Sequence, residues 1–162
     1  MADLNQQAEV FTNLILELFR LNGVLLAVGD RLTGPVGLSS ARWQVLGVVE
    51  HGPISVAHVA RTMGLTRQTV RQTAEGLFKD GFIVYADNPH HRRSRLMELT
   101  PKGRAALDYV AQRQAQWASA VVANQDLANL NETFDTLHQL RQTLEIYEET
   151  NADETQSSES DG

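Results

Sequence analysis

Two short stretches of the sequence concentrate side chains that can donate hydrogen bonds to phosphates or to the edges of nucleic-acid bases. The first stretch supplies six polar residues: Thr66, Arg67, Gln68, Thr69, Arg71 and Gln72. Arginine can donate a bidentate pair to guanine O6/N7, and glutamine can do the same for adenine N6/N7. Threonines at a helix N-terminus suit phosphate, because free amides and the helix dipole favour an anion there. Any amphipathic surface helix also turns Arg and Gln outward, so this stretch alone does not decide the matter.

The second stretch is strongly basic and lies between two short β-prone runs, 82–85 and 95–99. It holds five basic residues within six positions: His90, His91, Arg92, Arg93 and Arg95. Such a hairpin tip can place arginines in a narrow minor groove, although a charge run by itself is more often a solvated loop. A polar helix followed by a basic hairpin is more specific than either feature alone.

Charge is distributed unevenly along the 162 residues, whose net charge is −6. Residues 145–162 hold seven acids and no base, which leaves a net charge of +1 on residues 1–144. Residues 61–104 carry nine bases and four acids. A local basic surface on a nearly neutral body is the electrostatic footprint of a nucleic-acid-binding protein.

Apolar residues at steps of three and four predict the helices that position these side chains. A first helix over 4–31 ends at Gly34, Pro35 and Gly37, and a second runs from Ser39 or Ser40 to about Glu50. The third and fourth helices, 55–63 and 66–80, are joined through Gly64-Leu65 as in a helix-turn-helix. We expect four apolar residues of the fourth helix to face inward: Val70, Ala74, Leu77 and Phe78.

The remaining elements complete a mainly α fold with a small β-hairpin. Thr100-Pro101 begins a fifth helix that runs to about Asn124, and Asp126 caps a sixth. Four domains are predicted: an N-terminal dimerisation helix (1–33), a winged helix-turn-helix DNA-binding lobe (34–99), C-terminal dimerisation helices (100–148) and a disordered acidic tail (149–162).

Four stretches of the sequence resemble the MarR family of winged-helix transcriptional regulators. They cover residues 54–70, 77–83, 88–96 and 99–104, and the resemblance as a whole extends over about residues 4–147. It implies that 66–75 is the recognition helix and 88–95 the wing. It also implies a homodimer, which would bind a pseudo-palindromic DNA operator. Repression is the default outcome for a DNA-binding protein without a visible polymerase-contacting segment.

One position departs from the family pattern, because His91 stands where members commonly have Asp before the paired wing arginines. Asp87 is a possible substitute for that acid. If His90 or His91 gains charge near pH 6.5, DNA affinity would rise as the pH falls. The alternative is that both are ordinary exposed histidines.

The resemblance also implies control by a small aromatic or lipophilic effector. Such a ligand would favour a dimer geometry that mismatches the groove spacing of DNA. Candidates for lining its pocket are Arg42, Trp43 and His51 on or next to the second helix, although residues of these types at such positions are more often core or surface residues.

Several other classes of protein are not expected. The chain has no Cys, its five His lack zinc spacing, and no Gly-rich phosphate loop or nucleophile elbow is present, so we expect no enzyme, metal or cofactor. No unbroken apolar run approaches the ~18 residues of a membrane-spanning helix, so a cytoplasmic protein is expected. The remaining alternative is a winged-helix adaptor that binds protein, against which the arginines of the two stretches argue.

Overall fold

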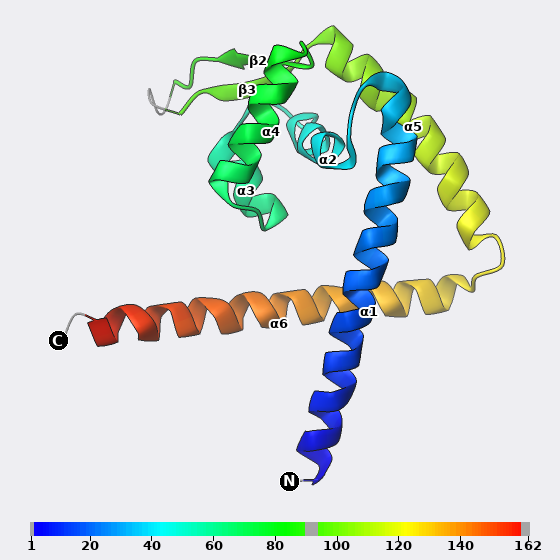
Figure 1. The fold of residues 1–162 in the computed structure, drawn as a ribbon, viewed down its shortest axis with the longest axis vertical. Helices are drawn as coiled ribbons and strands as arrows, with labels where there is room; N and C mark the ends of the chain where they lie inside the picture. The colour runs from blue at the N-terminus through cyan, green and yellow to red at the C-terminus, as the bar shows by residue number, and fades with distance from the viewer. Residues whose placement is uncertain (1, 90–93, 160–162) are drawn as a thin grey trace. The chain divides into compact units, whose positions relative to one another are not determined.

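The fold is that of a computed structural model, which describes residues 2–89 and 94–159 (Figure 1). The chain divides into two compact units, Met1–Gln116 and Trp117–Gly162, which are described separately. The elements, in chain order, are α1 (Ala2–Thr33), the 3-10 turn η1 (Gly34–Val36), α2 (Ser40–Val49), β1 (Ile54–Ser55), α3 (Val56–Met63), α4 (Arg67–Lys79), β2 (Ile83–Ala86), β3 (Leu96–Leu99), α5 (Pro101–Val122) and α6 (Leu127–Glu159).

The junction between α1 and α2 is fixed by buried polar contacts. Thr33 is fully buried, and its hydroxyl donates to the carbonyl oxygens of Gly29 and Leu38. The Ser40 amide donates to Asp30 Oδ1 at 2.7 Å, and Gly29 packs so closely on the Ser40 side chain that a Cβ would not fit. The C-terminal end of α1 is therefore held firmly against the lobe that follows.

The helix-turn-helix forms as the sequence predicts, because each helix has its own cap. The Ser55 side chain accepts from the His58 amide at the start of α3, and Gly64 ends that helix with φ +62. A side chain at φ > 0 would be strained, so the turn into α4 favours glycine. Helix α4 contacts both α3 and strand β2 (Figure 1).

The sheet has three strands in the described residues, one more than the predicted hairpin. The order is β1-β3-β2, and both pairings are antiparallel. Ile54 of β1 pairs with Met97 of β3, which in turn pairs with Tyr85 of β2. The sequence indicated only a short extended residue at Ile54, because a two-residue strand has no periodicity to detect.

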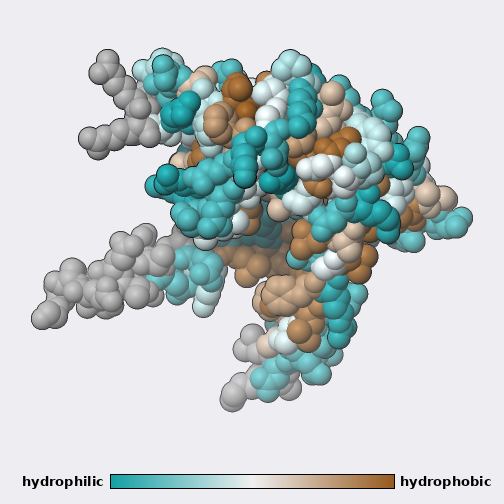
Figure 2. All heavy atoms as spheres, turned by 45° about the horizontal axis from the view of Figure 1, so that its top comes forward, coloured by the Kyte–Doolittle hydropathy of each residue, from teal (hydrophilic) through white to brown (hydrophobic). Residues whose placement is uncertain are grey.

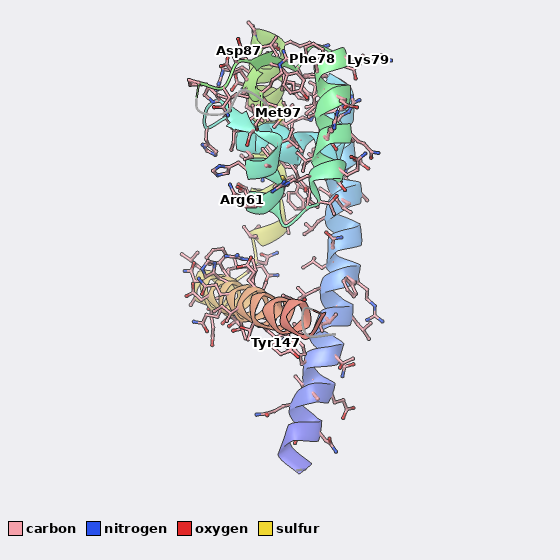
Figure 3. All side chains as sticks on the ribbon, turned by 90° about the vertical axis from the view of Figure 1, so that its left-hand side faces the viewer. Arg61, Phe78, Lys79, Asp87, Met97 and Tyr147 are labelled. Atoms are coloured by element: carbon pink, nitrogen blue, oxygen red, sulfur yellow. The ribbon has the colours of Figure 1, made fainter. Side chains whose placement is uncertain are left out.

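The core of the first unit lies between α2, α3, α4, the sheet and the start of α5. Leu46, Leu77, Ile83 and Met97 are among its fully buried side chains. The expectation that Phe78 faces inward is wrong, since 48% of that residue is exposed. Figure 3 shows Phe78 on the side of α4 that faces the hairpin, and its ring centroid lies 5.2 Å from that of Tyr85 on β2.

The start of α5 is attached to the lobe at the end of β3. The Thr100 hydroxyl donates to the Gly81 carbonyl oxygen at 2.7 Å and accepts from the Gly103 amide at 3.1 Å. Gly103 packs against the backbone of Phe82 with no room for a Cβ. This confirms the helix start predicted at Thr100-Pro101.

Helix α6 continues beyond its predicted end. Its first turn is capped as expected, with the Ala128 amide donating to Asp126 Oδ1. It extends to Glu159, so the segment 149–159 is helical where we expected disorder. In this part of the helix Thr150 and Asn151 donate to the carbonyl oxygens of Ile146 and Tyr147, one turn earlier.

Helix α1 presents many apolar side chains that its own unit does not cover. Val10, Phe19 and Val24 are 62%, 70% and 60% exposed. Figure 2 shows brown, apolar atoms along the projecting part of this helix. By length and composition, residues Asn5–Val36 are long and apolar enough to cross a membrane. The search of the sequence for unbroken apolar runs did not find this segment, because polar residues interrupt each run in it. A helix that packs in a soluble protein passes the same test, so this evidence for a membrane is weak.

Candidate nucleic-acid interface

The outer face of α4 carries the polar residues that the sequence singled out. Val70, Ala74 and Leu77 are fully buried on the inner face. The helical period therefore turns the first stretch outward, and all its residues are exposed: Thr66, Arg67, Gln68, Thr69, Arg71 and Gln72. The local fold thus presents base-reading side chain types to solvent on a helix that the core holds in place.

Thr66 and Thr69 have a structural role at the start of α4. The Thr66 side chain accepts from the Thr69 amide at 3.1 Å, and the two hydroxyl oxygens lie 2.8 Å apart. An N-cap of this kind satisfies one of the free amides of the first turn. Both threonines remain exposed, so the other free amides at this helix end can still meet a phosphate.

Arg71 has a partner on its own helix. Its Nε donates to Glu75 Oε1 at 3.1 Å, one helical turn away, and both side chains are more than 60% exposed. An exposed pair of this kind contributes only about 0.3–0.5 kcal/mol to stability. Arg71 can therefore exchange this carboxylate for a base or a phosphate at little cost.

A groove of about 480 Å³ separates α4 from the wing strands. Arg67, Arg71 and Glu75 line it from α4, whereas Tyr85 and Arg95 line it from the hairpin. Three guanidinium groups thus converge on one hollow that opens to solvent. Such a surface suits a polyanion that fills the groove and contacts both elements.

Tyr85 lies between the two sides of this groove. Its ring centroid is 5.2 Å from that of Phe78, and the Arg95 guanidinium lies 4.8 Å above its ring. Burial, and next the charge of Glu75, raise the pKa of Tyr85, while Arg95 and Arg71 act in the opposite direction. The phenol is therefore neutral at physiological pH.

The tip of the wing lies outside the described residues. His90, His91, Arg92 and Arg93 belong to that segment, so their proposed contacts and the pH response of the histidines remain predictions. Of the five basic residues predicted for the wing tip, Arg95 is the one that lies within the described residues. It is exposed, and its Nη2 donates to the Tyr85 carbonyl oxygen at 3.2 Å.

The comparisons with known proteins agree with this geometry. Residues 36–94, which contain the helix-turn-helix and most of the hairpin, match the model of the MarR family. An uncharacterised protein of Mycobacterium tuberculosis is 32% identical over 133 residues, which are 82% of this chain and 93% of that protein. The chain belongs to the MarR family. It is a winged-helix, DNA-binding transcription regulator.

Other MarR-family proteins are similar over most of the chain. The transcriptional activatory protein BadR of Rhodopseudomonas palustris is 26% identical over 85% of this chain and 79% of its own length. CouR of Rhodococcus jostii, solved with p-coumaroyl-CoA bound, is 25% identical with a TM-score of 0.68, covering 76% of this chain and 87% of CouR. MosR of M. tuberculosis, solved with DNA, is 24% identical with a TM-score of 0.67, covering 80% of this chain and 96% of MosR, and shares the fold.

The structure gives the three suggested effector-pocket residues of this MarR-family chain different surroundings. Arg42 Nη1 donates to Asp80 Oδ2 at 2.7 Å, and its guanidinium packs on Gly76 of α4. Trp43 is half-buried against the core, and His51 is exposed in the turn after α2. None of the three lines the groove beside α4. Their role in binding an effector remains a prediction.

Two site residues were missed by sequence reasoning, Tyr85 and Asp80. The sequence predicted Tyr85 only as part of a β-strand and Asp80 only as the end of the fourth helix. The alternation of β2 could have indicated Tyr85, since Ile83 and Tyr85 share one face of the strand and Val84, 45% exposed, takes the other. No local pattern indicates that Asp80 meets Arg42, because the two residues are 38 positions apart.

Proposed function

We propose that this MarR-family regulator is a ligand-responsive repressor that binds a pseudo-palindromic operator as a homodimer. The observation that carries the proposal is the convergence of Arg67, Arg71 and Arg95 on one groove between α4 and the wing. In this arrangement α4 enters the major groove and reads base edges through Arg67, Gln68, Arg71 and Gln72. The wing reaches the adjacent minor groove or backbone through Arg92, Arg93 and Arg95.

Dimerisation is supported by apolar side chains that are exposed within each unit taken by itself. On α1 these include Phe19 and Val24, and in the second unit they include Phe134 and Ile146, at 67% and 64% exposure. Apolar surface of this extent on a soluble protein marks an interface. A second copy of the chain would cover it and place two recognition helices about 34 Å apart, one helical turn of DNA.

An effector is proposed because CouR, at 25% identity, was solved with p-coumaroyl-CoA. A small aromatic or lipophilic ligand would act by binding more tightly to a dimer geometry that does not fit the operator. A tenfold loss of DNA affinity requires about 1.4 kcal/mol of differential binding. Arg42, Trp43 and His51 remain the proposed candidates for its pocket.

Repression is the proposed outcome, because a protein bound to an operator that overlaps a promoter blocks RNA polymerase without needing any further contact surface. BadR, a 26% identical relative, is named as an activator, so the direction needs its own test. In vitro transcription from a promoter that carries the operator should fall when the protein is added. A rise would assign activation instead. The proposed location is the cytoplasm, where such an operator is accessible.

The experiment that tests DNA binding is the salt dependence of affinity for a fragment flanking the chain's own coding region. Affinity should fall linearly on a log–log plot, and Arg92→Ala/Arg93→Ala/Arg95→Ala should reduce the slope by about one for each phosphate interaction that the substitutions remove. Arg61→Ala, which removes an exposed arginine of α3 outside the groove, is the control. A wing variant that binds like the wild type at every salt concentration would refute the wing assignment. Absence of any DNA binding would favour the protein-binding adaptor.

A further inference from the structure

Tyr85 is the residue through which the wing of this chain meets its recognition helix. It lies on β2, its ring contacts Phe78 of α4, and the Arg95 guanidinium stacks over the same ring beside the groove. The Tyr85 carbonyl oxygen accepts from Arg95 Nη2, so both the ring and the backbone of one residue hold this arginine. Arg95 directly precedes β3, the strand that pairs with β2 across the hairpin.

We propose that Tyr85 is a positioning residue that holds Arg95 beside α4, where Arg95 contacts a backbone phosphate of the operator next to the bases that Arg67 and Arg71 read. This rests on the proposed function and corrects one part of it. Arg95 then serves the groove next to the recognition helix, whereas Arg92 and Arg93 remain the arginines for the minor groove.

The geometry favours this role over a solvated arginine. A guanidinium within about 6 Å of a ring centroid is attracted by the ring quadrupole, and here the separation is 4.8 Å. The hydrogen bond of 3.2 Å to the Tyr85 carbonyl oxygen fixes a second point of the planar group. An arginine held at two points loses less conformational freedom when it binds a phosphate.

The other side of the groove supplies matching groups. Arg67, Arg71 and Glu75 of α4 line the same hollow as Tyr85 and Arg95. The Arg71–Glu75 pair is exposed and exchangeable, so Arg71 can reach a base edge while Arg95 meets the neighbouring phosphate. The Tyr85 phenol is neutral at physiological pH, as a tyrosine with a pKa of 10.0 or above must be, so it orients Arg95 without neutralising the charge of that arginine.

The test is a double-mutant cycle of Tyr85→Leu and Arg95→Ala, read out by operator affinity and its salt slope. Arg95→Ala should weaken binding about tenfold and lower the salt slope of the dimer by about two, because one phosphate contact is lost in each of the two copies. Tyr85→Leu removes no charge, yet it should also lower the slope toward that of Arg95→Ala. In the Tyr85→Leu background, Arg95→Ala should cost less than about twofold, because the two changes act on one interaction.

Two control variants separate positioning from general destabilisation. Tyr85→Phe keeps the ring and should bind within about twofold of the wild type. Arg113→Ala removes the equivalent stack on α5, where the guanidinium lies 5.2 Å from the Tyr109 ring, and should leave the slope unchanged. Thermal unfolding of each variant identifies any loss of folded protein. Additive effects of Tyr85→Leu and Arg95→Ala, or an unchanged slope in folded Tyr85→Leu, would overturn the inference.

An NMR measurement without DNA distinguishes this inference from the proposed function. Arg95 side-chain protons should be shifted upfield by the ring in the wild type and in Tyr85→Phe, but not in Tyr85→Leu. If the shift is present and the wild type binds no DNA in dilute salt, the proposed function fails while Tyr85 still holds Arg95. If DNA binds and the shift is absent, the positioning role fails alone.

Discussion

Arg71 is the residue of the recognition helix whose environment bears most directly on base preference. It lies on the exposed face of α4, paired with Glu75 by a contact that costs little to break. We predict that Arg71→Ala relaxes the preference at one base pair of each half-site by about 1–3 kcal/mol. Selection of binding sites from a randomised operator measures this. Arg61→Ala, an exposed arginine of α3 outside the groove, is the control, and an equal loss on every sequence would make Arg71 a phosphate contact.

The raised pKa of Tyr85 predicts that the protein loses stability at alkaline pH. Burial and Glu75 raise its pKa above the usual 10.0, so the folded protein holds the phenol proton at a pH where the unfolded chain has released it. The contribution of the Tyr85 phenol to the free energy of unfolding is complete below pH 10. It decreases as the pH rises through the pKa of Tyr85 in the folded protein. Urea denaturation of the wild type and Tyr85→Phe between pH 8 and about 11 measures the difference. Identical pH profiles would contradict the assigned shift.

Single residues also mark the limit of sequence reasoning. The exposed residues of α4 follow from a helical period and could be predicted. The contacts of Phe78, Tyr85 and Arg95 could not, because they join α4 to the hairpin and depend on how closely those elements pack. Arg42 is a similar case, since its ion pair with Asp80 crosses from α2 to the end of α4.

Among the elements, α4 depends on the cap at its N-terminus. Thr66→Ala should destabilise the protein by about 1 kcal/mol, because it leaves the Thr69 amide without its acceptor. Urea denaturation measures the change. Thr62→Ala is the matched control, since that exposed hydroxyl donates to the His58 carbonyl oxygen within α3 and caps nothing. Equal effects of the two changes would show that the cap contributes no more than an ordinary helical threonine.

The elements themselves were largely predictable from their end signals. Ser39, Ser55 and Thr66 cap α2, α3 and α4, and Gly64 ends α3 as expected. The pairing of β1 with β3 was missed because it joins residues about forty positions apart. The end of α6 was misplaced because an acidic composition indicates poor packing but does not by itself stop a helix.

For the whole molecule, the exposed apolar side chains of α1 predict an obligate pairing of two chains. Phe19→Asp should weaken dimerisation at least tenfold, since burying one Phe is worth about 1.5–3 kcal/mol. Sedimentation equilibrium measures the dissociation constant. The control is Val84→Asp, a change at an exposed apolar residue of β2 in the DNA-binding lobe. Retention of a tight dimer by Phe19→Asp would exclude this part of α1 from the interface.

DNase I footprinting of the purified protein on DNA flanking its own coding region tests the central claim most directly. The account predicts two protected half-sites about 10 base pairs apart, centre to centre, related by a two-fold axis. The protection should weaken as salt increases and disappear in the wing triple variant at the same protein concentration. Folded, dimeric protein that protects no part of this DNA even in dilute salt would contradict the account.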